Sequence, residues 1–489
     1  MIHWGISANN HDAALAVFVD DDLVFASSSE RFSKVKNDEH LDSRLLNYAL
    51  SWGQPDKVFW FESTWKKSLR QIFAGQSITA ISAKKYLQQY NIRVPIKTTE
   101  HHGSHAAAGY YTSKFDDACV LVIDAIGEFK SLSIWQGSEK NLNLQYSLDY
   151  PHSVGLWYSA MTQRCGLKPI DEEYILMGMA ALGDPNRLTR DILNDFVSMP
   201  IDDYNNPVQF KQNLHRGCNW WRPELSSQQD LYDIAAATQQ VYEIIFERIL
   251  QFCLTKSSSK NLVLMGGCAL NCSANALAYR YFKNVWIMPS PGDSGSAIGA
   301  VLAHTNKHIT WPGVYLGYDL GYHVDNQQIV THLIENKMCG IARGKAEFGP
   351  RALGNRSLLA DPRDPNIKEL VNDIKQREQF RPFAPAILEE YADQYFVMPV
   401  TATPYMQYTA MCRSPENFPG IVHVDGTSRV QTVNKTDNPQ FRELLELWHE
   451  QTGCPMLLNT SLNVKGQPIV NDMKDITEWS ATYGLPVFN

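Results

Sequence analysis

The sequence predicts an α/β protein of two large lobes, the first of which is internally duplicated. At 489 residues the chain is too long for one ordinary core, and roughly 150 residues per domain would give about three units. Apolar runs of strand length alternate with stretches of helical periodicity, a mixture typical of layered α/β folds. Two strand-turn-strand segments of similar plan, one near the start and one beginning at residue 120, suggest the duplication.

The individual elements support this fold class. Apolar residues flank the acidic turn at residues 20–22, which is typical of a hairpin, and residues 120–135 repeat the pattern. Residues 231–254 carry apolar side chains at helical spacing. An apolar run at residues 261–271 enters glycines and then a predicted helix at 273–281, and residues 286–295 end another strand in a small-residue turn.

The composition is that of a globular enzyme. Hydrophobic residues make up 44% and charged residues 20% of the chain, and no apolar run approaches the length of a membrane span. Residues 1–6 resemble a strand and not a secretory signal, so we expect a cytoplasmic protein without a membrane partner. Arginine and proline become frequent after residues 317–321, which places a boundary between domains at residues 1–320 and 321–489.

Cysteine usage and net charge exclude several classes of protein. The nine cysteines are scattered without a CxxC pair, so neither a disulfide framework nor a zinc ribbon is indicated, and reduced buried thiols are expected. A net charge of -8 gives no general attraction to nucleic acid or to anionic membranes. Polymeric nucleic acid is therefore a disfavoured partner.

A group of histidines begins an alanine-rich segment that favours a helix. His101 and His105 are four residues apart and would share one face of that helix, a common arrangement for holding a transition metal. The alternative is a capped helix whose histidines are solvated. Asp124 and Asp293 each follow an apolar strand, so both carboxylates are expected at the ligand-binding edge of a sheet, although either could simply cap a turn.

Residues 344–357 concentrate cations among glycines and a proline. Lys345, Arg351 and Arg356 lie in this segment, which is suited to phosphate because guanidinium forks bind it bidentately and glycine lets backbone amides approach. The alternative is a salt-bridged surface loop. Arg381 adds a cation before a proline, and residues 457–463 form a strand that runs into amide and hydroxyl groups suited to a nucleotide or a carbamoyl group.

These segments together resemble the ATP-dependent O-carbamoyltransferases that modify antibiotics and nodulation factors. The matching stretches include the tetrapeptide Ser29-Glu30-Arg31-Phe32 and run in the family's order over nearly the whole chain. They are residues 10–14, 29–32, 101–106, 173–174, 177–180, 266–272, 347–357, 381–385 and 457–463.

The resemblance implies an N-terminal lobe of the actin-like, sugar-kinase and heat-shock ATPase type, followed by a YrdC-like α/β lobe. The second lobe would make carbamoyl-AMP from carbamoyl phosphate and ATP, with magnesium, and the first would transfer the carbamoyl group to an acceptor hydroxyl. By position in the family, the residues that bind phosphates are Lys345, Arg351, Arg356, Arg381 and Arg429. Asn459 and Ser461 would orient the carbamoyl group.

The resemblance also implies a metal, usually iron(II), in the N-terminal lobe. Its ligands would be His101, His105, Asp124 and Asp293. Gly266, Gly267 and Asn271 would bind the adenylate in the same lobe. His11 and Asp12 lie where the acceptor hydroxyl would be activated, and a neutral imidazole is a reasonable general base.

Other functions remain as alternatives. Carbamoylating relatives that serve tRNA modification or hydrogenase maturation share both lobe types but differ in lobe order or carry extra modules. A metalloprotease would need glutamate where His102 follows His101. An actin-like nucleotide-binding scaffold without transferase activity would leave the arginine-rich lobe unexplained.

The acceptor is left open by the sequence. A hydroxyl on a small natural product or sugar is the family default, and a hydroxymethylated nucleotide or nucleic acid base is the alternative. The resemblance favours a homodimer.

Overall fold

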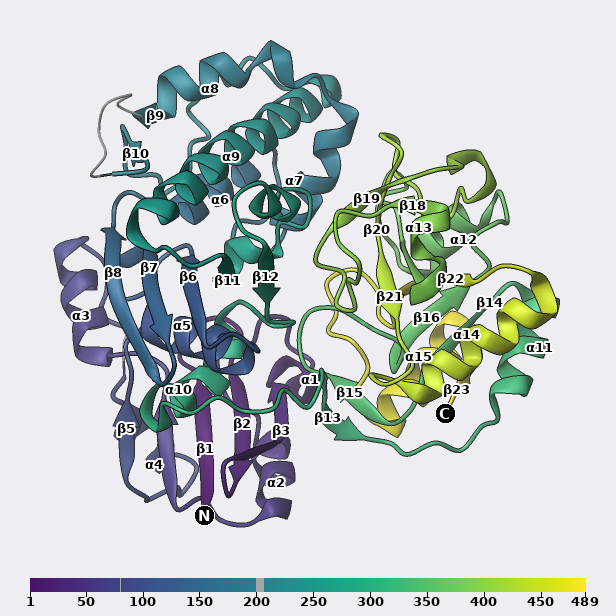
Figure 1. Cartoon of the computed structure of the whole chain (residues 1–489), viewed down its shortest axis with the longest axis horizontal. Helices are drawn as coiled ribbons and strands as arrows, with labels where there is room; N and C mark the ends of the chain where they lie inside the picture. Colours follow the sequence, from purple (N-terminus) through teal and green to yellow (C-terminus); the bar gives the residue numbers. More distant parts are fainter. Residues whose placement is uncertain (80, 199–205) are drawn as a thin grey trace. The chain divides into compact units, whose positions relative to one another are not determined.

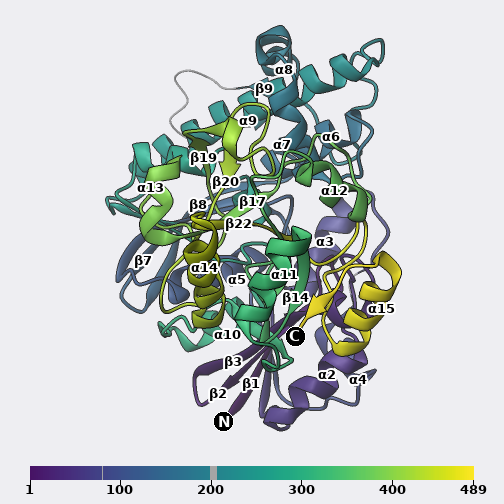
Figure 2. The ribbon, with the colours of Figure 1, turned by 90° about the vertical axis from the view of Figure 1, so that its right-hand side faces the viewer.

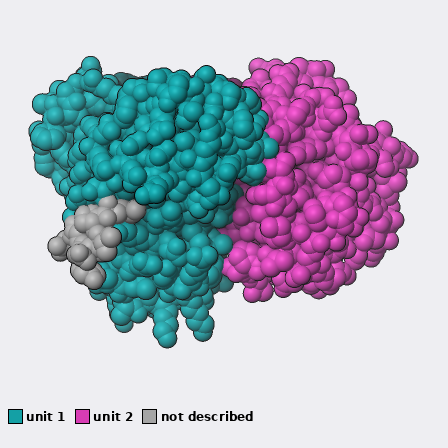
Figure 3. Space-filling view, turned by 90° about the horizontal axis from the view of Figure 1, so that it is seen from above, with its two compact units in different colours: residues 1–29, 39–311 teal, residues 30–38, 312–489 magenta. Residues whose placement is uncertain are grey.

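The computed structural model describes residues 1–79, 81–198 and 206–489 (Figure 1). The chain forms two compact units (Figure 3). Unit 1 consists of residues 1–29 and 39–311, and unit 2 consists of residues 30–38 and 312–489. The chain therefore passes between the units three times, where the sequence suggested a single boundary near residue 320.

Unit 1 contains two five-stranded sheets of the same order and direction. In each, three consecutive strands pair antiparallel, and two later strands join in parallel beside the first of the three. The first sheet has the order β3 (Asp22–Ser28), β2 (Ala14–Val19), β1 (Ile2–Ser7), β4 (Lys57–Trp60), β5 (Ile96–Thr98). The second has the order β8 (Asn141–Asp149), β7 (Lys130–Ser138), β6 (Asp117–Ile123), β11 (Asn261–Met265), β12 (Asn284–Ile287). The predicted duplication is confirmed, and the plan is that of an actin-like lobe.

Each half of unit 1 ends in a helix, and these two helices pack tightly on one another. They are α5 (His101–Thr112) and α10 (Ser296–Thr305). A Cβ added to Gly299 of α10 would lie 1.8 Å from the backbone oxygen of Ser104 in α5, so only glycine permits this approach. The two helices therefore meet near their N-termini, since Ser104 and Gly299 are each the fourth residue of their helix.

The remaining helices of unit 1 include one long helix, α9 (Gln228–Lys256), which confirms the helix predicted at residues 231–254. A capping box between Ser227 and Asp230 begins it. The shorter helices are α2 (Ser43–Ala49), α3 (Thr64–Phe73), α4 (Ala83–Gln88), α6 (Val154–Arg164), α7 (Glu173–Met179) and α8 (Thr189–Phe196). Strands β9 (Val197–Ser198) and β10 (Gln209–Phe210) form a small separate sheet.

The helix predicted after the glycines at residues 266–267 is wrong in type. The chain there forms two 3₁₀ helices, η4 (Gly267–Leu270) and η5 (Asn275–Arg280). The Asn271 side chain accepts a hydrogen bond from the Ala274 backbone N–H, and the Asn275 side chain donates one to the Ala269 carbonyl. These side-chain bonds compete with the backbone bonds that an α-helix would need.

Unit 2 is built on a mixed six-stranded sheet. Helices α11 (Asn326–Asn336) and α14 (Pro439–Thr452) lie side by side over one face, where Figure 2 shows them toward the viewer. The helices packed on the other face are α12 (Ile367–Ile374), α13 (Ala392–Tyr395) and α15 (Met473–Tyr483). The strand order is β21 (Gln431–Val433), β17 (Ala384–Leu388), β22 (Met456–Ser461), β16 (Arg356–Ala360), β14 (Met338–Ala342), β23 (Val487–Phe488). The second lobe is therefore α/β, as predicted.

Smaller elements complete unit 2. Helix α1 (Glu30–Ser33) belongs to residues 30–38, the N-terminal segment that is part of unit 2. The short strands are β13 (Tyr315–Asp319) with β15 (Lys345–Glu347), and β18 (Phe396–Val397) with β19 (Thr409–Cys412) and β20 (Thr427–Arg429). All nine cysteines have free thiols. Among the described residues, no helix combines the length and the apolar character that crossing a membrane would require.

Candidate functional site

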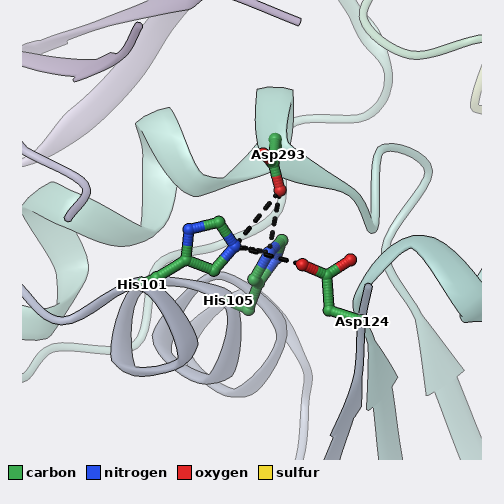
Figure 4. A group of neighbouring side chains, drawn as sticks. All are labelled: His101, His105, Asp124 and Asp293. Carbon is green, nitrogen blue, oxygen red and sulfur yellow. Dashed lines mark hydrogen bonds and ion pairs between the residues drawn. The ribbon is translucent and has the colours of Figure 1, made fainter. Parts of the chain in front are cut away.

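Four buried side chains from three parts of unit 1 converge on one point (Figure 4). They are His101, His105, Asp124 and Asp293, and one ligand atom from each lies within 4.8 Å of the others. The two Nε2 atoms are 3.1 Å apart, and Asp293 Oδ1 is 3.3 Å from both. Asp124 Oδ2 is 3.2 Å from His101 Nε2. Two imidazole nitrogens and two carboxylates form a donor set that fits iron(II) or another divalent transition metal.

The duplicated fold explains why these groups meet. His101 and His105 lie on the first turns of α5, and Asp293 opens the 3₁₀ turn that leads into α10, the equivalent helix of the second half. Asp124 directly follows β6. The equivalent strand of the first half, β1, is followed by the loop of Asn10 and His11. The four residues of the cluster and the loop that contacts them thus all follow the carboxyl ends of strands in the two sheets.

When no cation is bound, the residues of the cluster strongly shift one another's pKa. Burial by itself lowers the pKa of His101, but Asp293 and Asp124 outweigh burial and hold that pKa well above its usual range. Burial by itself raises the pKa of Asp293, but His101 and His11 hold it well below its usual range. The carboxylates are therefore ionised and able to act as metal ligands. His102 is not part of the cluster, because its Nδ1 lies 2.8 Å from Ser133 Oγ on β7.

A buried carboxylate fixes the start of α5. Both oxygens of Glu128 accept the His101 backbone N–H, at 3.0 and 3.1 Å, and Oε1 also accepts the Ser63 N–H at 2.7 Å. A carboxylate at a helix N-terminus satisfies orphan N–H groups and interacts favourably with the helix dipole. The sequence analysis missed Glu128, since its distance of 27 residues from His101 carries no periodic signal.

The loop after β1 contacts the cluster. Asn10 Nδ2 donates to Asp293 Oδ2 at 3.0 Å, and His11 Nε2 lies 3.8 Å from the same oxygen. His11 Nδ1 lies 3.1 Å from Asp12 Oδ2. Although burial opposes it, these carboxylates raise the pKa of His11 to about 10. A cation bound to Asp293 would act in the opposite direction.

Buried Lys67 holds this loop in place. Its Nζ donates to the Asn9 carbonyl at 3.1 Å and to Glu62 Oε1 at 3.0 Å. Lys67 comes from α3, whose polar face is turned inward toward the loop.

The glycines predicted to bind an adenylate lie beside the cluster of histidines and aspartates. Gly267 N–H donates to Asp124 Oδ1 at 3.1 Å. Gly266 has φ +90°, and a Cβ there would lie 2.2 Å from the Ile123 carbonyl oxygen, so the turn needs glycine. Asn271 is buried, and its amide exchanges hydrogen bonds with the Gln239 amide at 3.0 and 3.1 Å.

Gln239 belongs to a polar network that the sequence analysis missed. It accepts the Tyr158 hydroxyl at 3.0 Å and donates to Glu243 at 2.9 Å. Burial raises the pKa of Glu243. Because these residues lie within helices α6 and α9, the sequence does not distinguish them from other polar residues of a helix.

In unit 2, a single carboxylate organises the predicted phosphate loop between β15 and β16. Glu347 is buried, and its Oε1 accepts the backbone N–H groups of Leu353 at 2.7 Å, Asn355 at 2.8 Å and Arg356 at 3.3 Å. Gly349 and Gly354 have φ values of +133° and +114°. The loop is therefore closed around a fixed anion, with half-buried Arg351 at its middle.

Arg356 corrects the predicted set of phosphate ligands. Its side chain is fully buried and donates to the carbonyl oxygens of five residues, which are Tyr318, Arg343, Gly344, Asn355 and Asn471. Burial lowers the pKa of Arg356 to about 10. A guanidinium used in this way supports the backbone beneath the loop and presents no free fork to a phosphate.

The two predicted carbamoyl-orienting residues lie on β22 and contact different partners. Asn459 Nδ2 donates to the Ala352 carbonyl at 3.2 Å, which joins β22 to the phosphate loop. Its Oδ1 is buried without a hydrogen-bond partner in the part of the chain that the structure describes. The Ser461 hydroxyl bonds to Asn463 at 2.6 Å and lies 3.3 Å from Lys375 Nζ.

Lys375 is a functional candidate that the sequence analysis missed. Its Nζ is buried and also bonds to the Asn463 carbonyl at 3.0 Å and amide oxygen at 2.9 Å. Burial, together with the cations of Arg377 and Arg381, holds the pKa of Lys375 well below its usual range. The density of cations at residues 375–381 is a signal that would have found it.

The other predicted phosphate ligands occupy separate positions. Lys345 is exposed at the start of β15, and Arg381 is half-buried with Nη1 3.3 Å from Glu378 Oε2. Arg429 is half-buried at the end of β20, and its Nε has no hydrogen-bond partner among residues 1–79, 81–198 and 206–489.

Solved structures resemble this chain only distantly. A ROK family glucokinase from Streptomyces griseus is 9% identical with a TM-score of 0.31, covering 61% of this chain and 98% of that one. HypF from T. kodakarensis is 11% identical with a TM-score of 0.33, covering 62% of this chain and 47% of that one. Scores of this size support no conclusion about activity.

Relatives and family models match far more of the sequence. The chain is 32% identical to an uncharacterised protein of Synechocystis sp., with 96% of this chain and 92% of that protein aligned. It is 31% identical to nodulation protein NolNO of Sinorhizobium fredii, over 95% of this chain and 76% of that protein. It is 27% identical to 3'-hydroxymethylcephem-O-carbamoyltransferase of Amycolatopsis lactamdurans, over 97% of this chain and 95% of that protein. Residues 61–302 match the carbamoyltransferase N-terminus and residues 330–488 the carbamoyltransferase C-terminus. The chain belongs to the carbamoyltransferase family.

Proposed function

We propose that this protein is an ATP-dependent O-carbamoyltransferase that works in two steps. In unit 2, carbamoyl phosphate, ATP and water give carbamoyl-AMP, pyrophosphate and phosphate. In unit 1, the oxygen of an acceptor hydroxyl attacks the carbamoyl carbon and forms a bond to it, and AMP leaves. The observation that carries the proposal is the buried cluster of two histidines and two aspartates beside Gly267 in a member of this family.

The first step is assigned to the cation-rich part of unit 2. Arg351 lies on the Glu347-centred loop, and Lys375 and Arg381 lie near Ser461, so anionic substrates would meet several cations there. Among the described residues, Lys375 Nζ bonds to Ser461 and Asn463 and forms no ion pair with a carboxylate, so a bound anion would favour its charged form. We assign Arg356 to the support of the loop.

The second step is assigned to unit 1. His101, His105, Asp124 and Asp293 would hold iron(II) or a similar metal, which when bound supplies a Lewis acid for a phosphate or carbamoyl oxygen. Gly266 is required by the turn beside the cluster, Gly267 donates its N–H to Asp124, and Asn271 is held near them by Gln239, so we assign this segment to the adenylate. His11, positioned by Asp12, lies close enough to the cluster to accept or hold the acceptor proton.

The acceptor is proposed to be a small molecule that carries a hydroxyl group. The relative from Amycolatopsis is named for a hydroxymethyl group on a cephem, and the other named relative is a nodulation protein. A hydroxymethylated nucleotide is the second candidate acceptor, and competition assays with both kinds of hydroxyl compound would rank them.

The experiment that tests the proposal separates the two steps. The purified protein is incubated with ATP, carbamoyl phosphate, magnesium and iron(II) without acceptor, and pyrophosphate is followed. We expect pyrophosphate release that requires carbamoyl phosphate, and Arg351→Ala should lower it by about 100-fold or more. Arg413→Ala, an exposed arginine of the same unit, is the matched control and should retain the activity.

Variant His105→Ala distinguishes the transfer step. It should keep pyrophosphate release, because its side chain belongs to unit 1, and lose carbamoyl transfer to an acceptor. Conversion of ATP to ADP alone, or pyrophosphate release that ignores carbamoyl phosphate, would contradict the proposal.

A further inference from the structure

A segment from the N-terminal part of the chain is built into unit 2. This segment, residues 30–38, is here named the strap, and it belongs to unit 2 although residues 1–29 and 39–311 form unit 1. Lys34 of the strap forms an ion pair with Asp475, and the Phe32 ring lies edge-on to Tyr318 with a centroid distance of 6.3 Å. The strap is thus attached to unit 2 by both charged and apolar contacts.

The strap places one cation against the backbone of the phosphate loop. Arg31 is only 3% exposed, and its Nη2 donates to the Glu347 carbonyl at 3.4 Å and to the Gly349 carbonyl at 3.1 Å. These two residues are where the chain leaves β15 and enters the loop. An arginine remains charged even when buried, so both hydrogen bonds are charge-assisted.

Glu347, one of the two residues that Arg31 contacts, is also the residue that closes the loop. The Glu347 carboxylate accepts the N–H groups of Leu353, Asn355 and Arg356, while its backbone carbonyl accepts from Arg31. The Arg31 cation also lies close enough to this carboxylate for the two charges to interact electrostatically. A shift of the Glu347 backbone would therefore move the carboxylate that accepts the backbone N–H groups of residues 353, 355 and 356.

We propose that Arg31 is a positioning residue for the loop that carries Arg351. The strap then makes the carbamoyl-adenylate site of unit 2 dependent on a residue from the N-terminal part of the chain. This inference rests on the proposed function of unit 2, and it adds a residue that contacts neither phosphate nor carbamoyl group and acts through Glu347 and Gly349.

The test compares Arg31→Ala, Arg31→Lys and Lys34→Ala in the full-length protein. Lys34 is the matched control, because it anchors the same strap to Asp475 and bonds to the backbone carbonyl of Arg31, so its loss leaves the Arg31 guanidinium and its two loop contacts in place. The first readout is amide hydrogen exchange of the peptide covering residues 350–356, measured without substrates. Loss of two charge-assisted hydrogen bonds should speed this exchange by about tenfold or more in Arg31→Ala. Arg31→Lys keeps a donor and should give a smaller change, and Lys34→Ala should leave the peptide unchanged.

The second readout is the pyrophosphate assay with ATP and carbamoyl phosphate. Misplacement of Arg351 should raise the KM for carbamoyl phosphate by about tenfold in Arg31→Ala and lower kcat less, because the groups of the reaction itself remain. The KM of Arg31→Lys should lie between the KM of the wild type and that of Arg31→Ala.

The two readouts separate failure of the inference from failure of the proposed function. Unchanged exchange in both Arg31 variants, or an equal change in Lys34→Ala, would overturn the positioning role. If even the wild-type protein releases no pyrophosphate while exchange still responds to Arg31, the proposed function fails and the structural role of Arg31 is supported. Should Arg31→Ala not fold, Arg31→Lys against Lys34→Ala decides the question by exchange alone.

Discussion

Two imidazoles and two carboxylates with converging ligand atoms should bind one metal ion per chain. Removal of one ligand by His105→Ala or Asp293→Asn should weaken binding of iron(II) by at least about 100-fold, since loss of a supporting residue alone typically costs 10 to 100-fold. His304→Ala, at the other end of α10, is the control and should bind normally. The measurement is metal content after dialysis together with a titration. An unchanged stoichiometry in both ligand variants would argue against this metal site.

At the residue scale, the sequence was informative where chemistry and local spacing coincide. His101 and His105 share a helix face by their spacing, and the two aspartates follow apolar strands, so all four were candidates before the structure was known. Arg356 was misjudged because arginine looks the same in sequence whether it faces a ligand or five backbone carbonyls. Burial, which separates these two uses, depends on contacts far apart along the chain.

At the element scale, the start of α5 should be a sensitive point. Glu128→Ala would leave the Ser63 and His101 N–H groups without their acceptor, and loss of these charged hydrogen bonds should destabilise unit 1 by about 2–3 kcal/mol. It should also weaken metal binding, because the His101 backbone is no longer fixed. Urea unfolding and the metal titration measure the two effects.

Glu100→Ala is the control for this prediction. Glu100 also precedes α5, but its side chain is 37% exposed and forms ion pairs with Lys66 and Lys130. Exposed pairs contribute little, so a loss of at most about 1 kcal/mol is expected. Equal losses for the two glutamates would show that Glu128 has no special role.

The contact between α5 and α10 should tolerate no added methyl group. In Gly299→Ala the new Cβ would meet the Ser104 carbonyl at 1.8 Å, and both backbones would have to move, which should cost about 1–3 kcal/mol or more. Because His101 and His105 lie on α5, metal affinity should fall as well. Thermal unfolding with and without metal checks both effects.

Gly103→Ala lies in the same helix α5 and provides the comparison. Its nearest neighbour to a new Cβ would be Thr99 Cγ2 at 3.5 Å, an ordinary contact. Alanine favours helix over glycine by up to about 1 kcal/mol, so this variant should be as stable as wild type or slightly more stable. A loss of stability in Gly103→Ala similar to that in Gly299→Ala would contradict the steric explanation.

Periodicity predicted some elements better than others. Residues 231–254 repeat apolar positions over many turns, and the helix formed there as expected. Residues 273–281 are too few for such a repeat, and Asn271 and Asn275 turned the segment into 3₁₀ structure by bonding to the backbone. The outcome there depended on two side-chain hydrogen bonds and not on the hydrophobic pattern.

At the scale of the whole molecule, duplication was visible in sequence while the path of the strap was not. Two hairpins of similar composition indicated the repeated sheets of unit 1. Residues 30–38 are too short to show a domain preference, and their place in unit 2 depends on partners such as Gly349 and Asp475, hundreds of residues away. Contacts of this range carry no local signal.

The two units should respond to different ligands. A divalent metal should protect α5 and the residues around Asp293 from hydrogen exchange, whereas carbamoyl phosphate with a non-hydrolysable ATP analogue should protect residues 345–356 and 375–381. A ligand at 100 times its Kd stabilises the state that binds it by about 2.7 kcal/mol, which slows exchange by about 100-fold for amides that open only when their unit unfolds. Variant His105→Ala should lose only the first protection and Arg351→Ala only the second. If either ligand still protected its segment in the variant that lacks its site, the assignment of one site to each unit would be wrong.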